Sequence, residues 1–285
     1  MNIHPREAAI GKAALEGRVT FDVDTCGIGD TALHCWHAEG YKALGVDCRF
    51  YATRQPHKDI VTMFGQKFAD SPKDAIVTGS DATHYNYEIR VDKGKTPRAT
   101  LWSRCLPLQP KPVRPTYVKA KWHGQVPYSD VLLFPLAEFH GRTWPLAYWV
   151  DLAWMLHAKG HTVCVCVPPS AKAIVPAVPR LWTPGNWSEI GFCMFLAKLV
   201  IANDSGPSHV AGTIGTPTLA IMGPTSRVFS HCPNVVEWTG AEPSCAGCHF
   251  DANAGYRAAC DAGCQVLMRL TPDIVRDQAQ RMLSL

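Results

Sequence analysis

The segment Ile201–Thr225, IANDSGPSHVAGTIGTPTLAIMGPT, decides the fold because it places turn residues between two apolar runs. The flanking runs, 199–204 and 216–223, have the composition of buried strands, and SHVAGTIG between them suits a short helix. A strand, a helix and a second strand in this order indicate a parallel sheet with crossover connections. In such sheets the loop at the carboxyl end of a strand lines the ligand crevice.

That loop carries residues suited to binding an anion. Asp204 and Ser205 follow the strand, where Gly206 and Pro207 turn the chain. His209 falls in the first turn of the helix, whose N–H groups and dipole favour an anion such as a diphosphate. A structural interpretation is equally open, in which Asp204 and Ser205 cap the helix and His209 is a hydrogen-bonded core residue.

The rest of the chain repeats the same alternation. Strands are predicted at 19–23, 48–53, 74–79, 130–136 and 161–167, and helices at 31–44, 59–68, 144–160, 189–199 and 271–285. The last helix has Thr271 as its N-cap and Pro272 at its first position. We therefore expect two Rossmann-like α/β domains, 1–125 and 126–270, followed by a helix that packs back toward the first domain. Ligands commonly bind in the cleft between two such domains.

The segment 93–124 interrupts this pattern. It holds eight Lys and Arg, five Pro and no Asp or Glu, and we expect a loop or linker. Such a basic run is either a solvated surface or a patch that attracts an anionic substrate. In the second case the acceptor contacts would be Lys111, Arg114, Lys119 and Lys121.

Composition narrows the class of protein. A chain of 285 residues that is 47% hydrophobic and 18% charged is globular. It has no run of about 20 apolar residues, and its beginning lacks the apolar region of a secretory signal. Twelve Cys in a chain long enough to bury a core indicate reduced thiols rather than a disulfide framework. We expect a cytoplasmic protein.

Four motifs together resemble glycosyltransferase family 9, the ADP-heptose:lipopolysaccharide heptosyltransferases. Three of them are DSGPSH at 204–209, HGRTWPLAYWVDLAWML at 140–156 and GIGDTAL at 27–33. The fourth, at 245–275, consists of CAGC, two further cysteines and then LTPDIV. The resemblance covers most of 130–280 and a short piece near residue 30. It implies the GT-B architecture, in which two Rossmann-like domains with parallel sheets face each other across a cleft. The acceptor would sit mainly on the first and the nucleotide sugar on the second.

The resemblance also implies roles for individual residues. Asp30 falls at the family's catalytic base, and Arg142 falls where the family usually has a Lys that contacts the donor phosphates. Arg keeps the charge but replaces a point charge with a planar fork. The implied donor-binding set is Arg142, Asp204, Ser205, Gly206, Pro207, His209 and Thr225. The implied reaction is inverting, metal-independent transfer of a heptose-like sugar from a nucleotide diphosphate, ADP for preference, to a hydroxyl of an anionic glycan.

These residue types suit that chemistry. A carboxylate such as Asp30 can take the proton from the acceptor hydroxyl, which is typically worth about 100- to 10,000-fold in rate. Arg142, His209 and the N–H groups after Ser205 can hold the charge that grows on the leaving diphosphate, without a metal or other cofactor. No Asp-x-Asp metal motif is convincing, and Asp22 and Asp24 at the end of a strand are interpreted as structural.

Cys245, Cys248, Cys260 and Cys264 form the pattern C-x2-C-x11-C-x3-C. Four thiolates at this spacing could hold a structural zinc ion. Unliganded thiols and local disulfides are the alternatives. Measuring the zinc content of the purified protein would distinguish a zinc site from these alternatives.

Several alternatives remain open from the sequence. The acceptor is either a lipid-linked saccharide, reached by a monomer at the inner face of the membrane, or modified DNA, because Lys and Arg contacts to phosphates would serve both. A catalytically inactive module that binds sugar nucleotides is a second alternative. The third is an NADP-dependent oxidoreductase, in which GIGDTA is the G-x-G-x-x-A fingerprint and Arg54 holds the 2′-phosphate.

Overall fold

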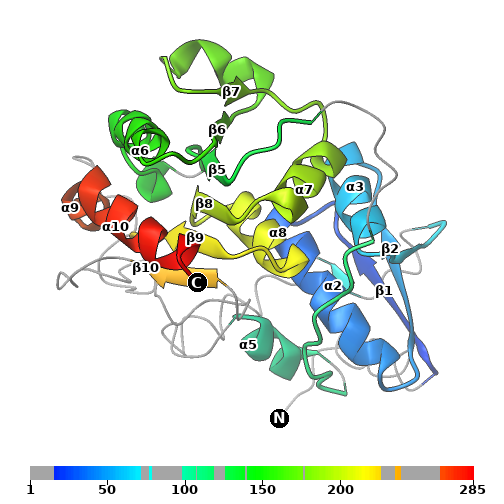
Figure 1. The fold of residues 1–285 in the computed structure, drawn as a ribbon. Helices are drawn as coiled ribbons and strands as arrows, with labels where there is room; N and C mark the ends of the chain where they lie inside the picture. Colours follow the sequence, from blue (N-terminus) through cyan, green and yellow to red (C-terminus); the bar gives the residue numbers. More distant parts are fainter. Residues whose placement is uncertain are drawn as a thin grey trace.

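The computed structural model has two parallel β-sheets with helices between and around them (Figure 1). It describes residues 16–71, 77–78, 98–106, 108–118, 126–138, 140–175, 177–225, 235–238 and 264–285. Strands β1 to β4 precede residue 125 and strands β5 to β10 follow it. One sheet is therefore built from the chain before residue 125 and the other from the chain after it, while the domain bounds 1–125 and 126–270 stay a prediction.

The first sheet has four parallel strands in the order β3-β2-β1-β4. Its strands are β1 (Arg18–Asp22), β2 (Asp47–Tyr51), β3 (Lys67–Phe68) and β4 (Val77–Thr78). Helices α2 (Ile28–Lys42) and α3 (Gln55–Met63) connect them. In β1 the three central residues are buried, as expected of a strand covered on both faces.

The second sheet has six parallel strands in the order β10-β9-β8-β5-β6-β7. They are β5 (Val131–Phe134), β6 (Val163–Cys166), β7 (Leu181–Trp182), β8 (Leu199–Asn203), β9 (Thr218–Ile221) and β10 (Val235–Trp238). The helices are α6 (Leu146–Ala158), α7 (Trp187–Leu196), α8 (Gly206–Ile214), α9 (Gln265–Arg269) and α10 (Pro272–Leu283). Every residue of the adjacent strands β5 and β8 is buried, which explains their continuous apolar sequence.

Two hydrophobic clusters fill the space around the second sheet. One cluster packs α6, α9 and α10 against one face, where Trp144 and Trp149 are fully buried. The other cluster lies on the opposite face and continues into the first sheet, so that Leu132 and Phe21 belong to the same core. Figure 1 shows α7 and α8 beside α2 and α3 in this shared layer. The two sheets are thus joined by a common core.

Helices α2 and α8 are in direct contact. A Cβ atom on Gly29 would lie 2.3 Å from Cδ2 of His209, so only glycine permits this approach. Farther along the pair, Trp36 Nε1 donates a hydrogen bond to Thr213 Oγ1 at 3.1 Å. The amino-terminal ends of both helices therefore meet at one place.

The segment 93–124 is not simply a loop, and that prediction is wrong for its middle. Residues Arg98–Cys105 form helix α5, on which Trp102 is buried. Trp102 stacks on His34 of α2, with ring centroids 5.5 Å apart. The following residues run along α2, where Val113 N donates to Trp36 O at 3.2 Å. Burial of Trp102 outweighs the basic, proline-rich composition that suggested a linker.

The C-terminal helix α10 begins after Thr271 with Pro272 at its first position, as the sequence predicts. It packs against α6 within the second sheet's layer, where Val275 and Ala279 are buried. Gln280 Nε2 also lies 2.9 Å from His161 Nε2. The expected return of this helix toward the first domain stays a prediction. None of the described helices has the length and hydropathy needed to cross a bilayer.

Candidate active site

The loop after β8 brings three charged or titratable side chains together. Asp204 Oδ2 lies 3.5 Å from Arg142 Nε, and Asp204 Oδ1 lies 3.8 Å from His209 Nε2. The Asp204 side chain is 8% exposed and that of His209 is 11% exposed, whereas that of Arg142 is 27% exposed. A buried carboxylate thus orients a guanidinium and an imidazole that lie at the start of α8.

Short polar side chains hold the backbone of this loop. Ser205 is the N-cap of α8, and its Oγ donates to Asn203 O at 3.2 Å. Ser208 Oγ donates to Ser205 O at 2.8 Å. The capping interpretation therefore holds for Ser205, while Asp204 faces Arg142 and His209 instead.

Asn203 connects this loop to the segment that carries Arg142. Its Oδ1 accepts from Trp144 N at 3.0 Å, and its Nδ2 donates to Pro135 O at 2.7 Å. Asn203 is fully buried, so its amide bonds replace the water it has lost. The DSGPSH and R-x-W-P motifs, about 60 residues apart in the chain, are consequently adjacent in space.

Asp30 lies at the amino-terminal end of α2, which meets the amino-terminal end of α8. Its Oδ2 accepts from Gly27 N at 3.2 Å. The neighbouring Gly29 is the residue in contact with His209, and Ile28 is next to Gly206. The structure therefore brings Asp30 to the junction of helices at which Asp204 contacts Arg142 and His209.

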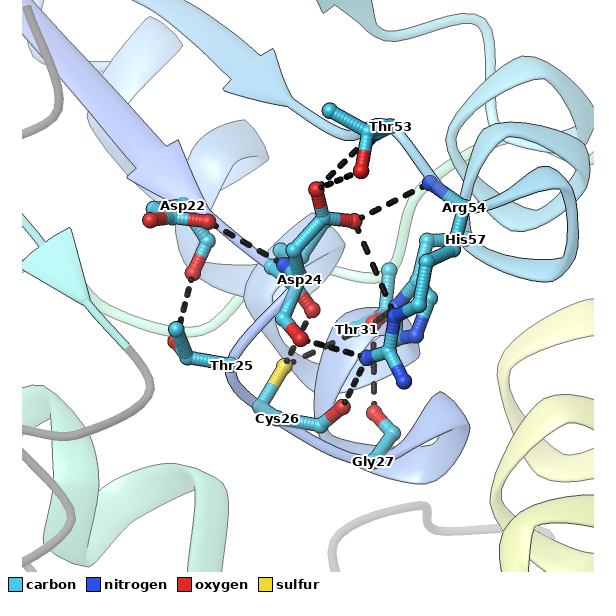
Figure 2. Close-up of polar contacts among 10 residues, drawn as sticks. Asp22, Asp24, Thr25, Cys26, Gly27, Thr31, Thr53, Arg54 and His57 are labelled. Atoms are coloured by element: carbon cyan, nitrogen blue, oxygen red, sulfur yellow. Dashed lines mark hydrogen bonds and ion pairs between the residues drawn. The ribbon is translucent and has the colours of Figure 1, made fainter. Parts of the chain in front are cut away.

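The turn before α2 is held by a dense set of polar contacts (Figure 2). The Asp24 carboxylate accepts from Thr53 N at 2.7 Å and from Arg54 N at 3.2 Å. Burial alone would raise the pKa of the Asp24 carboxyl, but the hydrogen bonds from Thr53 and Arg54 outweigh it and hold the pKa below its usual value. Asp24 is structural, as the sequence suggests.

His57 supports the same turn from α3. Its Nδ1 lies 2.8 Å from Thr31 Oγ1, and Thr31 Oγ1 donates to Gly27 O at 3.1 Å. Burial, reinforced by the charge of Arg54, lowers the pKa of His57 to about 4. His57 is therefore neutral near pH 7. No sequence motif predicts that His57 and Arg54 support this turn.

A hollow of about 480 Å³ opens beside these loops. It lies between the start of α3 and the carboxyl ends of β5 and β6, and its apolar lining includes Phe134, Leu136, Val167, Pro168, Trp187 and Pro207. Asp59 closes one wall, because its Oδ2 accepts from Trp187 N at 3.0 Å. No sequence pattern predicted this hollow, although Pro-rich turns follow two of the strands that form it.

Thr225 follows β9 at the same edge of the sheet. It is 3% exposed, and its Oγ1 has no hydrogen-bond partner among the described residues. A buried hydroxyl in this state costs free energy unless something else binds it.

The sequence model of glycosyltransferase family 9 (heptosyltransferase) matches residues 111–237. That segment includes both motif loops and is similar to glycosyltransferase family 9 over less than half of the chain. Among its relatives, lipopolysaccharide heptosyltransferase 3 of Escherichia coli is 27% identical over 133 residues, 40% of this chain. Lipooligosaccharide heptosyltransferase 2 of Haemophilus influenzae is 29% identical over 109 residues, 34% of this chain. These matches span only 39% and 32% of the relatives' own lengths.

Solved glycosyltransferase structures share this fold over nearly the whole chain. The iron-containing dodecameric glycosyltransferase TibC from enterotoxigenic E. coli has a TM-score of 0.68 at 15% identity, covering 93% of this chain and 76% of that one. The E. coli ADP-heptose lipopolysaccharide heptosyltransferase II has a TM-score of 0.60 at 13% identity, covering 94% and 98%. The architecture is therefore GT-B, as the sequence predicts.

Arg114, predicted to contact the acceptor, binds backbone carbonyls of α8. Its Nε donates to Thr213 O at 3.3 Å and its Nη2 donates to Ile214 O at 2.5 Å. These carbonyls end α8, so Arg114 caps that helix at the end away from Asp204. Arg114 thus makes a structural contact, and its predicted acceptor contact stays a prediction. Lys111 is exposed, while Lys119 and Lys121 lie outside the described residues.

Arg54, assigned to an NADP phosphate in the oxidoreductase alternative, instead donates to backbone carbonyls of the β1–α2 turn. The family match removes the reason for that alternative, and it offers no support for DNA as the acceptor.

Three of the four clustered cysteines, Cys245, Cys248 and Cys260, lie outside the described residues. Cys264 is buried at the start of α9, near Gly223. Within the described part of the chain, no three His, Cys, Asp or Glu side chains are grouped to hold a metal. The cysteine cluster therefore stays a prediction.

Proposed function

We propose that this protein is an inverting glycosyltransferase that moves a heptose-like sugar from an ADP-linked donor to a hydroxyl of an anionic glycan. The observation that carries the proposal is the junction of α2 and α8, where Asp30 lies beside the cluster of Arg142, Asp204 and His209. The names of the family 9 relatives, which are heptosyltransferases, support the sugar and the kind of acceptor.

The donor would bind at the start of α8. Arg142 and the N–H groups that open the helix would hold the diphosphate, with Asp204 orienting Arg142 and His209. Gly206 and Pro207 would let the phosphates approach the backbone, and the Thr225 hydroxyl would gain the partner it lacks. The hollow of about 480 Å³ would take the base of the nucleotide.

Asp30 would act as the general base. As the acceptor oxygen bonds to the anomeric carbon, the bond from that carbon to the diphosphate breaks, and the acceptor proton passes to Asp30. Attack on the face opposite the leaving group inverts the configuration. Arg142, His209 and the helix dipole would stabilise the negative charge that develops on the diphosphate, so this scheme needs no metal at the reacting atoms.

The acceptor is the less defined partner. Lys111 is an exposed cation, and Lys119 and Lys121 belong to the same basic run. An anionic saccharide carried on a lipid at the cytoplasmic face of the membrane fits this charge. We expect the protein to work there as a monomer.

The four clustered cysteines would form a structural metal site. Zinc is the ion that their spacing suggests, and the iron-containing neighbour TibC makes iron the competing candidate. Metal analysis of the purified protein should find about one equivalent of either ion if the four thiolates share it. Less than about half an equivalent of both would contradict the site.

Donor binding and turnover test the proposal. ADP-heptose should raise the Tm more than GDP-mannose or UDP-glucose, because a ligand that binds the folded state stabilises it by mass action. Wild-type protein should then release ADP from ADP-heptose. Binding without any release of ADP, with water or glycan as acceptor, would favour the inactive module. No stabilisation by any of the three donors would contradict the proposal.

A further inference from the structure

We propose that Arg54 is a positioning residue for Asp30, because its guanidinium holds the peptide group whose N–H binds the Asp30 carboxylate. The catalytic half of this inference rests on the proposed function, whereas the structural half stands on the contacts of the β1–α2 turn. The turn comprises residues Val23–Gly27, between β1 and α2.

Arg54 and Asp30 bind opposite ends of one peptide group. Arg54 Nη2 donates to Cys26 O at 3.1 Å and to Asp24 O at 2.6 Å. The Cys26 carbonyl shares its peptide group with the Gly27 N–H, which donates to Asp30 Oδ2 at 3.2 Å. A single rigid, planar unit therefore separates the guanidinium from the carboxylate.

That arrangement has an electrostatic consequence. A cation on the carbonyl oxygen polarises the peptide and makes its N–H a stronger donor, because linked hydrogen bonds strengthen one another. The carboxylate at the other end is an anion, so both bonds are charge-assisted. Arg54 thereby fixes the direction in which Asp30 points without touching it.

Asp24 places Arg54 for this task. The Asp24 carboxylate accepts from the Arg54 backbone N–H, from Thr53 N and from Thr53 Oγ1 at 2.5 Å, which ties the start of α3 to the turn. In return the Arg54 side chain binds the carbonyls of Asp24 and Cys26. Figure 2 shows this exchange of side-chain and backbone bonds between the two segments.

A second set of contacts fixes the next peptide along the chain. Thr31 Oγ1 donates to Gly27 O, so the Thr31 oxygen accepts from Nδ1 of the neutral His57. Both peptide groups that flank the Gly27 Cα are therefore held from α3, one by Arg54 and one by His57. The position of Gly27, set by both contacts, in turn sets the position of the Asp30 carboxylate that its N–H binds.

Three variants test the inference: Arg54→Ala, Arg54→Lys and the control Arg49→Ala. Arg49 lies on β2 and pairs with Asp47, so its loss removes one exposed cation without touching the turn. For hydrolysis of ADP-heptose, Arg54→Ala should lower kcat on the order of 10- to 100-fold while KM changes little, as expected when a reacting group is misplaced. Arg49→Ala should match wild type.

The Arg54 side chain is 52% exposed, so a small cation can replace it from solvent. Guanidinium at low millimolar concentration should restore part of the kcat of Arg54→Ala and leave Arg49→Ala unchanged. Arg54→Lys should fall between wild type and Arg54→Ala, because the shorter lysine side chain keeps a cation but cannot bring it as close to the two carbonyls that Arg54 Nη2 binds. A kcat for Arg54→Ala equal to that of wild type would overturn the inference, as would an unrescued loss that matches only a lower Tm.

Amide hydrogen exchange separates this inference from the proposed function. If wild type fails to turn over ADP-heptose, the proposed function fails. Amide exchange at Gly27–Thr31 still tests whether the Arg54 side chain stabilises the β1–α2 turn. Faster exchange there in Arg54→Ala than in Arg49→Ala supports it. Equal exchange in the two variants contradicts it.

Discussion

The two loops that meet at the junction of α2 and α8 are stabilised in opposite ways. In the β1–α2 turn, charged side chains bind the backbone: Asp24 accepts backbone N–H groups and Arg54 donates to backbone carbonyls. In the β8–α8 loop, neutral side chains such as Asn203 and Ser205 hold the backbone. The charged side chains there bind one another instead.

This difference indicates a division of tasks. The β1–α2 turn uses its charges to aim one carboxylate, Asp30, and a misaimed base should affect the rate of transfer. The β8–α8 loop keeps Arg142 and His209 together at the start of a helix, where their loss should affect donor affinity. Substitutions in the two loops should therefore differ in which kinetic constant they change.

The largest effect on kcat is expected for substitution of Asp30, the proposed general base. Asp30→Asn keeps the shape of the side chain but cannot accept a proton, so kcat should fall about 100- to 10,000-fold. Steady-state release of ADP from ADP-heptose measures it. Asp47→Asn, at an exposed site on β2, is the matched control and should keep wild-type kcat. A kcat for Asp30→Asn within a factor of two of wild type would remove Asp30 from the mechanism.

A smaller effect is expected for Arg142→Met, which should weaken ADP-heptose binding about 10- to 100-fold, because hydrogen bonds to charged groups contribute about 1.5–3 kcal/mol. The matched control is Arg180→Met, whose exposed guanidinium donates to Tyr128 O at 3.4 Å. Isothermal titration calorimetry gives both constants. Equal affinity in the two variants would contradict a phosphate contact by Arg142.

The contact between the loops can be disrupted with one methyl group. Gly29→Ala would place a Cβ atom 2.3 Å from His209 Cδ2, so either the imidazole or the helix must move. We expect a loss of about 1–3 kcal/mol in the free energy of unfolding, which is typical of overpacking. Urea denaturation measures the loss. Unchanged stability together with unchanged donor affinity would mean that the helices are not packed as described.

The smallest effect concerns His57 and pH. Because burial lowers its pKa from 6.5 to about 4, the unfolded chain binds more protons than the folded one between these values. This contribution to stability is present above pH 6.5 and is lost as the pH falls toward 4. Arg54 lowers this pKa, while Asp24 and Asp30 oppose it.

His57→Asn removes the titrating group and keeps a donor for Thr31. The Tm advantage of wild type over His57→Asn at pH 7 should shrink by a few degrees at pH 4.5, since each pKa unit is worth about 1.4 kcal/mol. Thermal melts of both proteins across this range measure the gap. A gap that stays constant with pH would contradict a neutral, buried His57.

The sequence predicted β5, β6, β8 and β9 of the second sheet, whose residues are all buried, but it did not predict β7 or β10. Strands such as β5 and β8 read as continuous apolar runs, and Pro272 marked the start of α10. The sequence did not predict helix α5, because its basic composition suggested a loop. The buried side chain of Trp102 packs this helix against the fold. Local pattern is informative when burial is continuous along the segment and uninformative when it depends on a single residue.

At the candidate site, the sequence predicted which residues lie together but not the way they are held. The grouping of Arg142 with Asp204 and His209 agrees with the motifs, because each motif follows a strand of one sheet. The roles of Arg54 and Arg114 were not predictable, since both bind backbone carbonyls of segments distant in the chain. Such contacts leave no spacing or residue pattern in the sequence.

Equilibrium binding of ADP-heptose to Asp30→Asn and Arg142→Met tests the division of tasks most directly. Asp30→Asn should bind the donor with wild-type affinity although it turns over poorly, and Arg142→Met should bind about tenfold or more weakly. The contrary result, in which Asp30→Asn loses donor affinity and Arg142→Met retains it, would contradict the assignment of base and donor loops.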